Sequence, residues 1–178
     1  YRGQFKANKP DGQGTYVWPS GEKYIGEWRE GMKHGTGTHT FANGEKYRGQ
    51  FKAGKPDGHG TYDWPTGESY VGEWKNARKH GLGLEIYPSG EKYEGHFENG
   101  KKEGNGTYHW PTGDTYVGAF NGGKRNGPGY YRQANGTKTE TYFNNGQSLS
   151  DICMQKGLVV QTTKHDRCVL EIMRSMEF

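Results

Sequence analysis

The sequence is poor in the features that stabilise most small domains. Only two of its 178 residues are cysteines, Cys153 and Cys168, and both lie near the C-terminal end. They supply no disulfide framework for the chain, which favours a reducing compartment. No run of residues is apolar enough to span a membrane, and no secretory leader pattern is present. We therefore expect a soluble, cytoplasmic protein.

Sequence motifs of enzymes are also absent. There is no G-x-x-x-x-G-K-[ST], G-x-G-x-x-G or G-x-S-x-G pattern, and the seven histidines have no evident nucleophile beside them. Two cysteines are too few for a zinc site unless His165 and another chain supply ligands. We expect a protein that is not an enzyme, with no catalytic residue, cofactor or metal. The formal net charge of +4 is too small to indicate nucleic-acid binding.

Hydrophobic residues are scarce as well, at 29% of the chain, and the mean hydropathy is −1.15. Such a composition is typical of disorder, but 31 glycines and 14% aromatic residues recur here at fixed intervals. Each repeat of 23 residues begins with a tyrosine, followed two residues later by glycine and four residues later by an aromatic residue. A Gly-x-Gly pair and a turn glycine complete it. The tyrosines are Tyr1, Tyr24, Tyr47, Tyr70, Tyr93 and Tyr116.

Each repeat is predicted to be a β-hairpin. At the period of a strand, the tyrosine, the glycines and the following aromatic residue share one face, so that rings lie over the bare glycines of the neighbouring strand. A polar loop, residues 6–13 and 29–36 in the first two repeats, joins the strands. A Trp-Pro-Ser/Thr-Gly-Glu segment, as at residues 18–22, forms the return turn. The predicted fold is all-β, an elongated single-layer antiparallel meander of 23-residue β-hairpin repeats with a short C-terminal helical cap.

These repeats resemble MORN (membrane occupation and recognition nexus) repeats, whose pattern is a tyrosine, a glycine and an aromatic residue before a Gly-x-Gly pair. The resemblance covers residues 1–146, as six full repeats and a degenerate seventh in which Thr139 and Thr141 replace tyrosine and glycine while Phe143 remains. Because Tyr1 starts a repeat, we expect earlier repeats to be missing from this sequence. MORN repeats occur in cytoskeletal scaffolds, ciliary proteins and junctional membrane proteins, and as appendages of lipid kinases and a lysine methyltransferase. The resemblance therefore implies an interaction module, associated with the cytoskeleton or a membrane.

Residues 147–178 form a separate C-terminal tail. Residues 157–162 have the pattern of a short strand, and from Lys164 the apolar residues recur at helical spacing. This helix either caps the last strand of the open sheet or forms an interface with a second copy or a partner groove. The candidate tail interface consists of Val169, Ile172, Met173 and Met176.

The fourth repeat departs from the pattern, because Leu84 and Ile86 should point away from the aromatic face. They are either a packing variant or an apolar patch for a partner.

The aromatic face is the first candidate binding surface, because aromatic residues dominate the energetics of protein interfaces. The same rings are also the candidate core, so each is either structural, partner-binding or both. The residues are Tyr24, Trp28, Tyr47, Phe51, Tyr70, Trp74, Tyr93, Phe97, Trp18, Trp64 and Trp110.

The edge formed by the loops within the repeats is predicted to be basic. It either attracts anionic lipid headgroups or keeps a flat sheet soluble. The candidate lipid-binding residues are Lys33, Lys52, Lys55, Lys75, Arg78, Lys79, Lys101, Lys102, Lys124 and Arg125.

The main functional hypothesis is a non-enzymatic scaffold that binds a peptide or helix of a cytoskeletal or ciliary protein through the aromatic face, or self-associates as a homodimer through its C-terminal end. The alternative is phosphoinositide or anionic membrane-surface binding through the basic edge. A second alternative is a regulatory arm of an enzyme outside this sequence.

Overall fold

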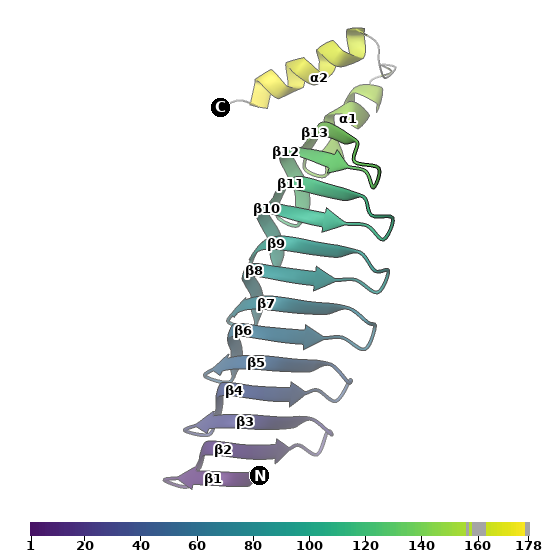
Figure 1. Ribbon diagram of the computed structural model, residues 1–178. Helices are drawn as coiled ribbons and strands as arrows, with labels where there is room; N and C mark the ends of the chain where they lie inside the picture. The colour runs from purple at the N-terminus through teal and green to yellow at the C-terminus, as the bar shows by residue number, and fades with distance from the viewer. Residues whose placement is uncertain (156, 158–162, 177–178) are drawn as a thin grey trace. The chain divides into compact units, whose positions relative to one another are not determined.

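The computed structural model describes residues 1–155, 157 and 163–176, which form an open antiparallel sheet of hairpins followed by two helices (Figure 1). The strands follow one another in the sheet in their order along the chain, from β1 to β14. This order confirms the predicted meander of hairpin repeats. The chain divides into two compact blocks, residues 1–101 and 102–178.

The first block contains nine strands among its described residues: β1 (Arg2–Lys6), β2 (Lys9–Val17), β3 (Lys23–Arg29), β4 (Met32–Thr40), β5 (Lys46–Lys52), β6 (Lys55–Asp63), β7 (Ser69–Lys75), β8 (Arg78–Ile86) and β9 (Lys92–Glu98). The second block contains β10 (Lys101–His109), whose first residue ends the first block, and then β11 (Thr115–Asn121), β12 (Lys124–Arg132), β13 (Lys138–Asn144), β14 (Gln147–Ser148), α1 (Leu149–Gln155) and α2 (Thr163–Met176).

The loops within the repeats are much shorter than predicted. In the second repeat, Arg29 pairs directly with Met32, so the loop consists of Glu30 and Gly31 alone. Both residues have positive φ, 51° and 81°, the combination found in tight type I′ hairpin turns. The prediction of a loop over residues 29–36 is therefore wrong, because a two-residue turn of this type matches the strand twist and lets pairing begin at once.

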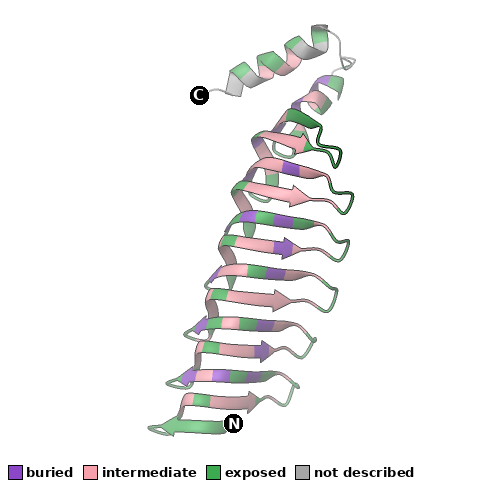
Figure 2. Cartoon of the chain, in the orientation of Figure 1, coloured by how far each residue is buried: buried purple, intermediate pink, exposed green. Residues whose placement is uncertain are grey.

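The predicted packing of rings over glycines is confirmed, as the third repeat illustrates. Tyr47 is fully buried, and its ring lies over Gly60, where an added Cβ would be 2.3 Å from the phenolic oxygen. The hydroxyl donates to the carbonyl oxygen of Gln50 at 2.9 Å. Edge-on contacts with Phe51 at 4.9 Å and Trp74 at 5.4 Å, between ring centroids, hold the ring in place. Buried positions accordingly recur along the odd-numbered strands in Figure 2.

The first glycine of each Gly-x-Gly pair has another role than the predicted one. Gly58 has a φ of 103° and lies at a β-bulge between β5 and β6, where it contacts the Gln50 side chain instead of a ring. The side-chain oxygen of Gln50 accepts a hydrogen bond from the amide of His59 at 2.7 Å. This glycine therefore serves the bulge, since a Cβ there would lie 1.9 to 2.1 Å from the glutamine oxygen in the first and third repeats.

In the second block, the degenerate seventh repeat still contributes a strand. Phe143 on β13 is only 4% exposed, and β14 pairs with β13 beyond the expected end of the array. Helix α1 follows directly and contacts both strands, with Leu149 and Cys153 almost fully buried. The element that covers these strands is thus α1, which the sequence reasoning did not predict. Its first turn is capped by Ser148, whose hydroxyl oxygen accepts from the amide of Asp151 at 3.0 Å.

Helix α2 is the predicted amphipathic helix, and it contacts α1. A disulfide joins Cys153 of α1 to Cys168 of α2, with the two Cα atoms 6.0 Å apart. The expectation that disulfides play no part in the fold is wrong for the tail, and bridged sulfurs cannot serve as zinc ligands. Residues 158–162 of the predicted short strand and the side chains of Met173 and Met176 lie outside the described part of the chain.

Candidate functional site

Eight of the eleven predicted aromatic-face residues form the core. All eight are at most 7% exposed. Their hydroxyl and indole groups are used internally: Trp28 and Trp74 donate their indole N–H to the carbonyl oxygens of Gly14 and Gly60. These rings hold the strands together and are not accessible to a partner. The eight are Tyr24, Trp28, Tyr47, Phe51, Tyr70, Trp74, Tyr93 and Phe97.

The remaining predicted rings belong to a partly exposed series at the eighteenth position of the first five repeats, just before the return turns. Sequence reasoning found Trp18, Trp64 and Trp110 but missed Phe41 and Tyr87, although the spacing of 23 residues marks them. We call Trp18, Phe41, Trp64 and Tyr87, in the first block, the outer aromatic row.

Each of these rings is supported from within its own repeat. The Trp18 ring packs against Tyr16 at 4.4 Å, the Phe41 ring against His39 at 4.1 Å and the Trp64 ring against Tyr62 at 4.3 Å, between ring centroids. The next repeat also contributes neighbours, His39 at 5.8 Å from Trp18 and Tyr62 at 5.8 Å from Phe41, so the rings are fixed while part of their surface stays exposed. Fixed, half-exposed aromatic rings bind partner groups at a low cost in side-chain entropy.

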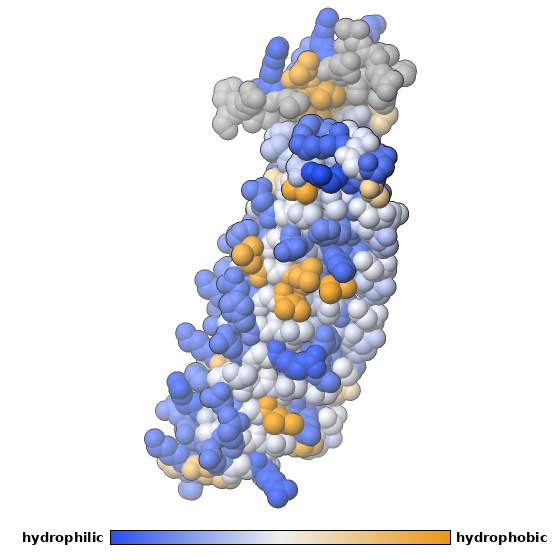
Figure 3. Space-filling model, viewed as in Figure 1, coloured by the Kyte–Doolittle hydropathy of each residue, from blue (hydrophilic) through white to orange (hydrophobic). Residues whose placement is uncertain are grey.

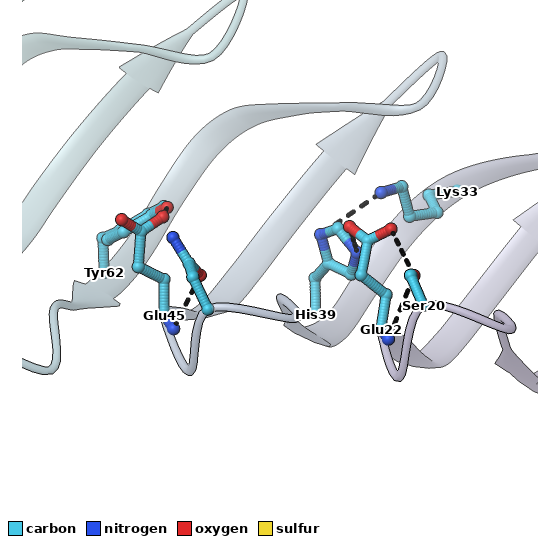
Figure 4. Close-up of polar contacts among 7 residues, drawn as sticks. Ser20, Glu22, Lys33, His39, Glu45 and Tyr62 are labelled. Carbon is cyan, nitrogen blue, oxygen red and sulfur yellow. Dashed lines mark hydrogen bonds and ion pairs between the residues drawn. The ribbon is translucent and has the colours of Figure 1, made fainter.

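Charged groups lie near the row, and Figure 4 shows Glu22 and Lys33 on either side of His39, with Glu45 beside Tyr62. Glu22 from a return turn lies 3.6 Å from the ring nitrogen Nε2 of His39, and Nζ of Lys33 lies 3.3 Å from Nδ1 of the same ring. Burial, together with the Lys33 ammonium, lowers the pKa of His39 to about 4, against the opposing pull of Glu22. His39 is therefore neutral near pH 7.

Two repeats later, a glutamate replaces this histidine. Lys79 forms ion pairs with Glu85 and, at 3.7 Å, with Glu68, and its ammonium lies 4.8 Å from the Trp64 ring centroid. Lys33 likewise lies 5.7 Å from the Trp18 ring. These two lysines were predicted to belong to the basic edge, but the structure places them against the aromatic face. Lys102 and Arg125 in the second block also contact rings, those of Tyr108 and Trp110 among others.

The other six predicted basic residues are exposed beside the two-residue loops. In the first block, Lys55, Lys75 and Arg78 line one groove of about 410 Å³ between neighbouring loops, together with Glu98. The six are Lys52, Lys55, Lys75, Arg78, Lys101 and Lys124.

The opposite face carries the apolar residues of the fourth repeat. Leu84 pairs with Val71 across β7 and β8, and Val71 and Leu82 are 46% and 57% exposed. Apolar side chains gather among polar ones on the face seen in Figure 3. Leu84 and Ile86 thus lie away from the aromatic face, as predicted, and are partly exposed.

The part of the chain that the structure describes contains no group of three or more histidine, cysteine or acidic side chains able to hold a metal ion. None of the described helices is long and apolar enough to cross a membrane.

The fold and the surface together define a class of protein, an open sheet of β-hairpin repeats with a core of tyrosine rings on glycines and a half-exposed aromatic row. The MORN repeat model matches six consecutive segments, residues 1–23, 24–46, 47–69, 70–92, 93–115 and 116–138. The chain therefore belongs to the MORN repeat family, a non-enzymatic repeat module suited to scaffolding. The seventh repeat is not among the matched segments.

No curated protein matches the sequence. Among solved structures, the chain is similar to the SAS-4 (dCPAP) TCP domain of Drosophila melanogaster, solved in complex with a proline-rich motif of Ana2 (dSTIL). The two are 16% identical, the match covers 76% of this chain and 87% of that chain, and the TM-score is 0.38.

Proposed function

We propose that this MORN protein is a non-enzymatic scaffold that binds an extended segment of a protein partner along the outer aromatic row. One observation carries the proposal: Trp18, Phe41 and Trp64 recur once per repeat, each fixed by a ring of its own repeat and each half-exposed. The core rings are buried by packing, so a partner can reach the outer row but not the core rings.

The spacing of the row favours a segment in the polyproline II conformation. Two strands separate equivalent rings, so neighbouring rings stand about 10 Å apart. A polyproline II segment has three residues per turn and a rise of about 3.1 Å per residue, which brings every third side chain to the same side about 9.3 Å apart. One partner residue in three can then meet successive rings.

The charge beside the row favours a basic segment. Glu22, Glu45 and Glu68 stand in successive return turns on the aromatic side, and Glu22 and Glu68 keep about a third of their side-chain surface exposed. The lysines that follow in sequence, Lys23 and Lys46, fall on the opposite face by strand alternation. Lys79, which also lies beside the row, is paired with Glu68 and keeps only 14% of its side-chain surface exposed, so the carboxylates are the more exposed charges that a partner meets there.

The test uses two labelled peptides of identical composition. One repeats the triplet Leu-Pro-Lys, and the other has its leucines moved out of the three-residue period. Titration into 15N-labelled protein should shift the indole signals of Trp18 and Trp64 with the periodic peptide only. Phe41→Ser should weaken this binding about tenfold, as expected for loss of an aromatic contact of about 1.4 kcal/mol.

Val71→Ser provides the matched control, because it removes an exposed apolar side chain from the opposite face. Equal losses in the two variants, or equal binding of the two peptides, would refute the use of the row.

A second candidate function is binding to an anionic membrane surface through the loop edge. It is favoured by the convergence of Lys55, Lys75 and Arg78 on one groove, since each such group contributes about 1 kcal/mol near an anionic surface. Flotation with phosphoinositide-containing liposomes should be lost when these three residues are changed to glutamate and kept when Lys33, which lies on the aromatic face, is changed to glutamine. If the protein does not float at physiological salt, the membrane hypothesis fails and the loop lysines serve solubility alone.

A further inference from the structure

A pocket in the second block marks a break in the aromatic pattern. It has a volume of about 330 Å³ and lies beside the partly exposed Trp110, with Tyr131 as its second ring. The centroids of these two rings are 6.0 Å apart and their planes are tilted by 36°. The lining residues are Trp110, Thr112, Asp114, Tyr131, Arg132 and Gln133.

The repeat register explains why the pocket is there. In four earlier repeats, the ring at the sixteenth position is covered by the ring two residues further on, at 4.1 to 4.9 Å between centroids. In the sixth repeat the sixteenth position is Tyr131, and the covering position holds Gln133. The pocket therefore lies beside the one full repeat in which Gln133 stands in place of the covering ring. The four covered pairs are Tyr16–Trp18, His39–Phe41, Tyr62–Trp64 and Tyr108–Trp110.

The charges around the pocket narrow the choice of occupant. The guanidinium carbon of Arg125 lies 5.7 Å from the Trp110 ring and 5.8 Å from the Tyr131 ring, and Arg125 donates to the Tyr131 hydroxyl. Arg132 stands in the wall. Both oxygens of Asp114 are already engaged, one by the amide of Ala134 and the other by the hydroxyl of Thr112, each at 2.9 Å. A cationic side chain is therefore disfavoured, whereas an uncharged ring finds two rings to stack on.

We propose that this pocket receives an aromatic side chain of a partner protein, which stacks on Tyr131 in place of the ring that Gln133 does not supply. The inference rests on the proposed function and deepens it. It adds one aromatic anchoring residue to the partner, besides the basic and apolar segment proposed to lie on the outer aromatic row. Aromatic side chains in well-formed pockets are the usual anchors of such interfaces.

The experiment uses the complete chain and three short capped peptides, Gly-Ser-Phe-Ser-Gly and its counterparts with leucine or lysine in the central place. The phenylalanine peptide should shift the indole signal of Trp110 and the ring signals of Tyr131. It should do so at concentrations where the leucine and lysine peptides have little effect.

Variants then test the place of binding. Gln133→Phe fills the pocket and should weaken binding of the phenylalanine peptide about tenfold, the value of one good aromatic contact. Gln133→Asn leaves the pocket open and should not weaken it. Trp64→Gln gives the third repeat the same arrangement, a tyrosine followed two residues later by glutamine, and should create a second binding place that shifts the ring signals of Tyr62.

The inference is overturned if the phenylalanine peptide leaves Trp110 unshifted, if leucine serves equally well, or if Gln133→Phe binds as tightly as the unaltered chain. These outcomes are separable from failure of the proposed function, because the periodic leucine peptide reports on Trp18 and Trp64 in the first block. Loss of one response with the other intact identifies which idea has failed.

Discussion

Replacing Gly60 by alanine tests the central claim about the core, that bare glycine leaves the space occupied by a tyrosine ring. A Cβ at this position would lie 2.3 Å from the hydroxyl oxygen of Tyr47 and 2.5 and 2.6 Å from two of its ring carbons. The ring cannot lift away, because it is fully buried and is held by Phe51 and Trp74. Overpacking of a tight core costs 1–3 kcal/mol, so with both sides fixed we expect a loss of about 3 kcal/mol.

The control is Gly54→Ala, in the two-residue loop of the same hairpin. Its φ is 84° and nothing lies within 4 Å of an added Cβ, so this change strains the backbone without a clash and should cost about 1 kcal/mol. Urea unfolding, followed by tryptophan fluorescence and by amide exchange on β5 and β6, measures both. A repeat array loses stability locally, so exchange should rise most in these two strands.

A second change identifies the contact responsible. If the ring causes the loss, Tyr47→Ala and Gly60→Ala should be strongly non-additive, because alanine at position 47 removes the group that alanine at position 60 strikes. Additive losses, or a Gly60→Ala protein within about 0.5 kcal/mol of the unaltered one, would refute the ring-on-glycine account.

Three further outcomes follow from the structure. Because burial lowers the pKa of His39 to about 4, the unfolded chain binds more protons than the folded chain between about pH 6.5 and 4. The free energy of unfolding should therefore fall by up to about 3 kcal/mol as the pH is lowered through this range. Urea melts at several pH values measure this loss, and His39→Tyr should remove it. Gln50→Ala should cost about 1 kcal/mol in the same melts, since the amide of His59 loses its acceptor, whereas Gln50→Glu should not. Reducing the Cys153–Cys168 disulfide should speed amide exchange in α2 and leave β3 to β8 unchanged, with a double serine variant insensitive to reductant.

The regular part of the fold could be predicted because two periodicities coincide in it. Alternation at period two placed Tyr24, Gly26 and Trp28 on one face, and repetition every 23 residues showed that the arrangement recurs. What periodicity does not encode is backbone detail. Gly35 and Gly37 look equivalent in sequence, yet only Gly35 has positive φ, at 53°, and an added Cβ there would meet the Glu27 side chain instead of a ring.

The candidate site was only partly predictable, for a related reason. Alternation gives the face on which a side chain lies but not its depth, so Trp28 and Trp64 looked alike although one is core and the other half-exposed. Lys33 was assigned to the loop edge by its neighbours in sequence, but the two-residue turn moves it into the strand and onto the rings. The disulfide depended on how α1 and α2 pack, which no repeat encodes.

The repeats differ from one another in how strictly each position keeps its residue type. The first and third positions are tyrosine and glycine in all six full repeats, as the ring-on-glycine core requires. The eighteenth position is Trp18, Phe41, Trp64, Tyr87, Trp110 and Gln133 in turn. Its rings lie outside the most buried layer, so their size can change without disturbing the strands beneath. A position that varies in this way while staying aromatic in five repeats fits the partner-binding surface that we propose. The sixth repeat departs from the series at Gln133, which lines the pocket beside Trp110.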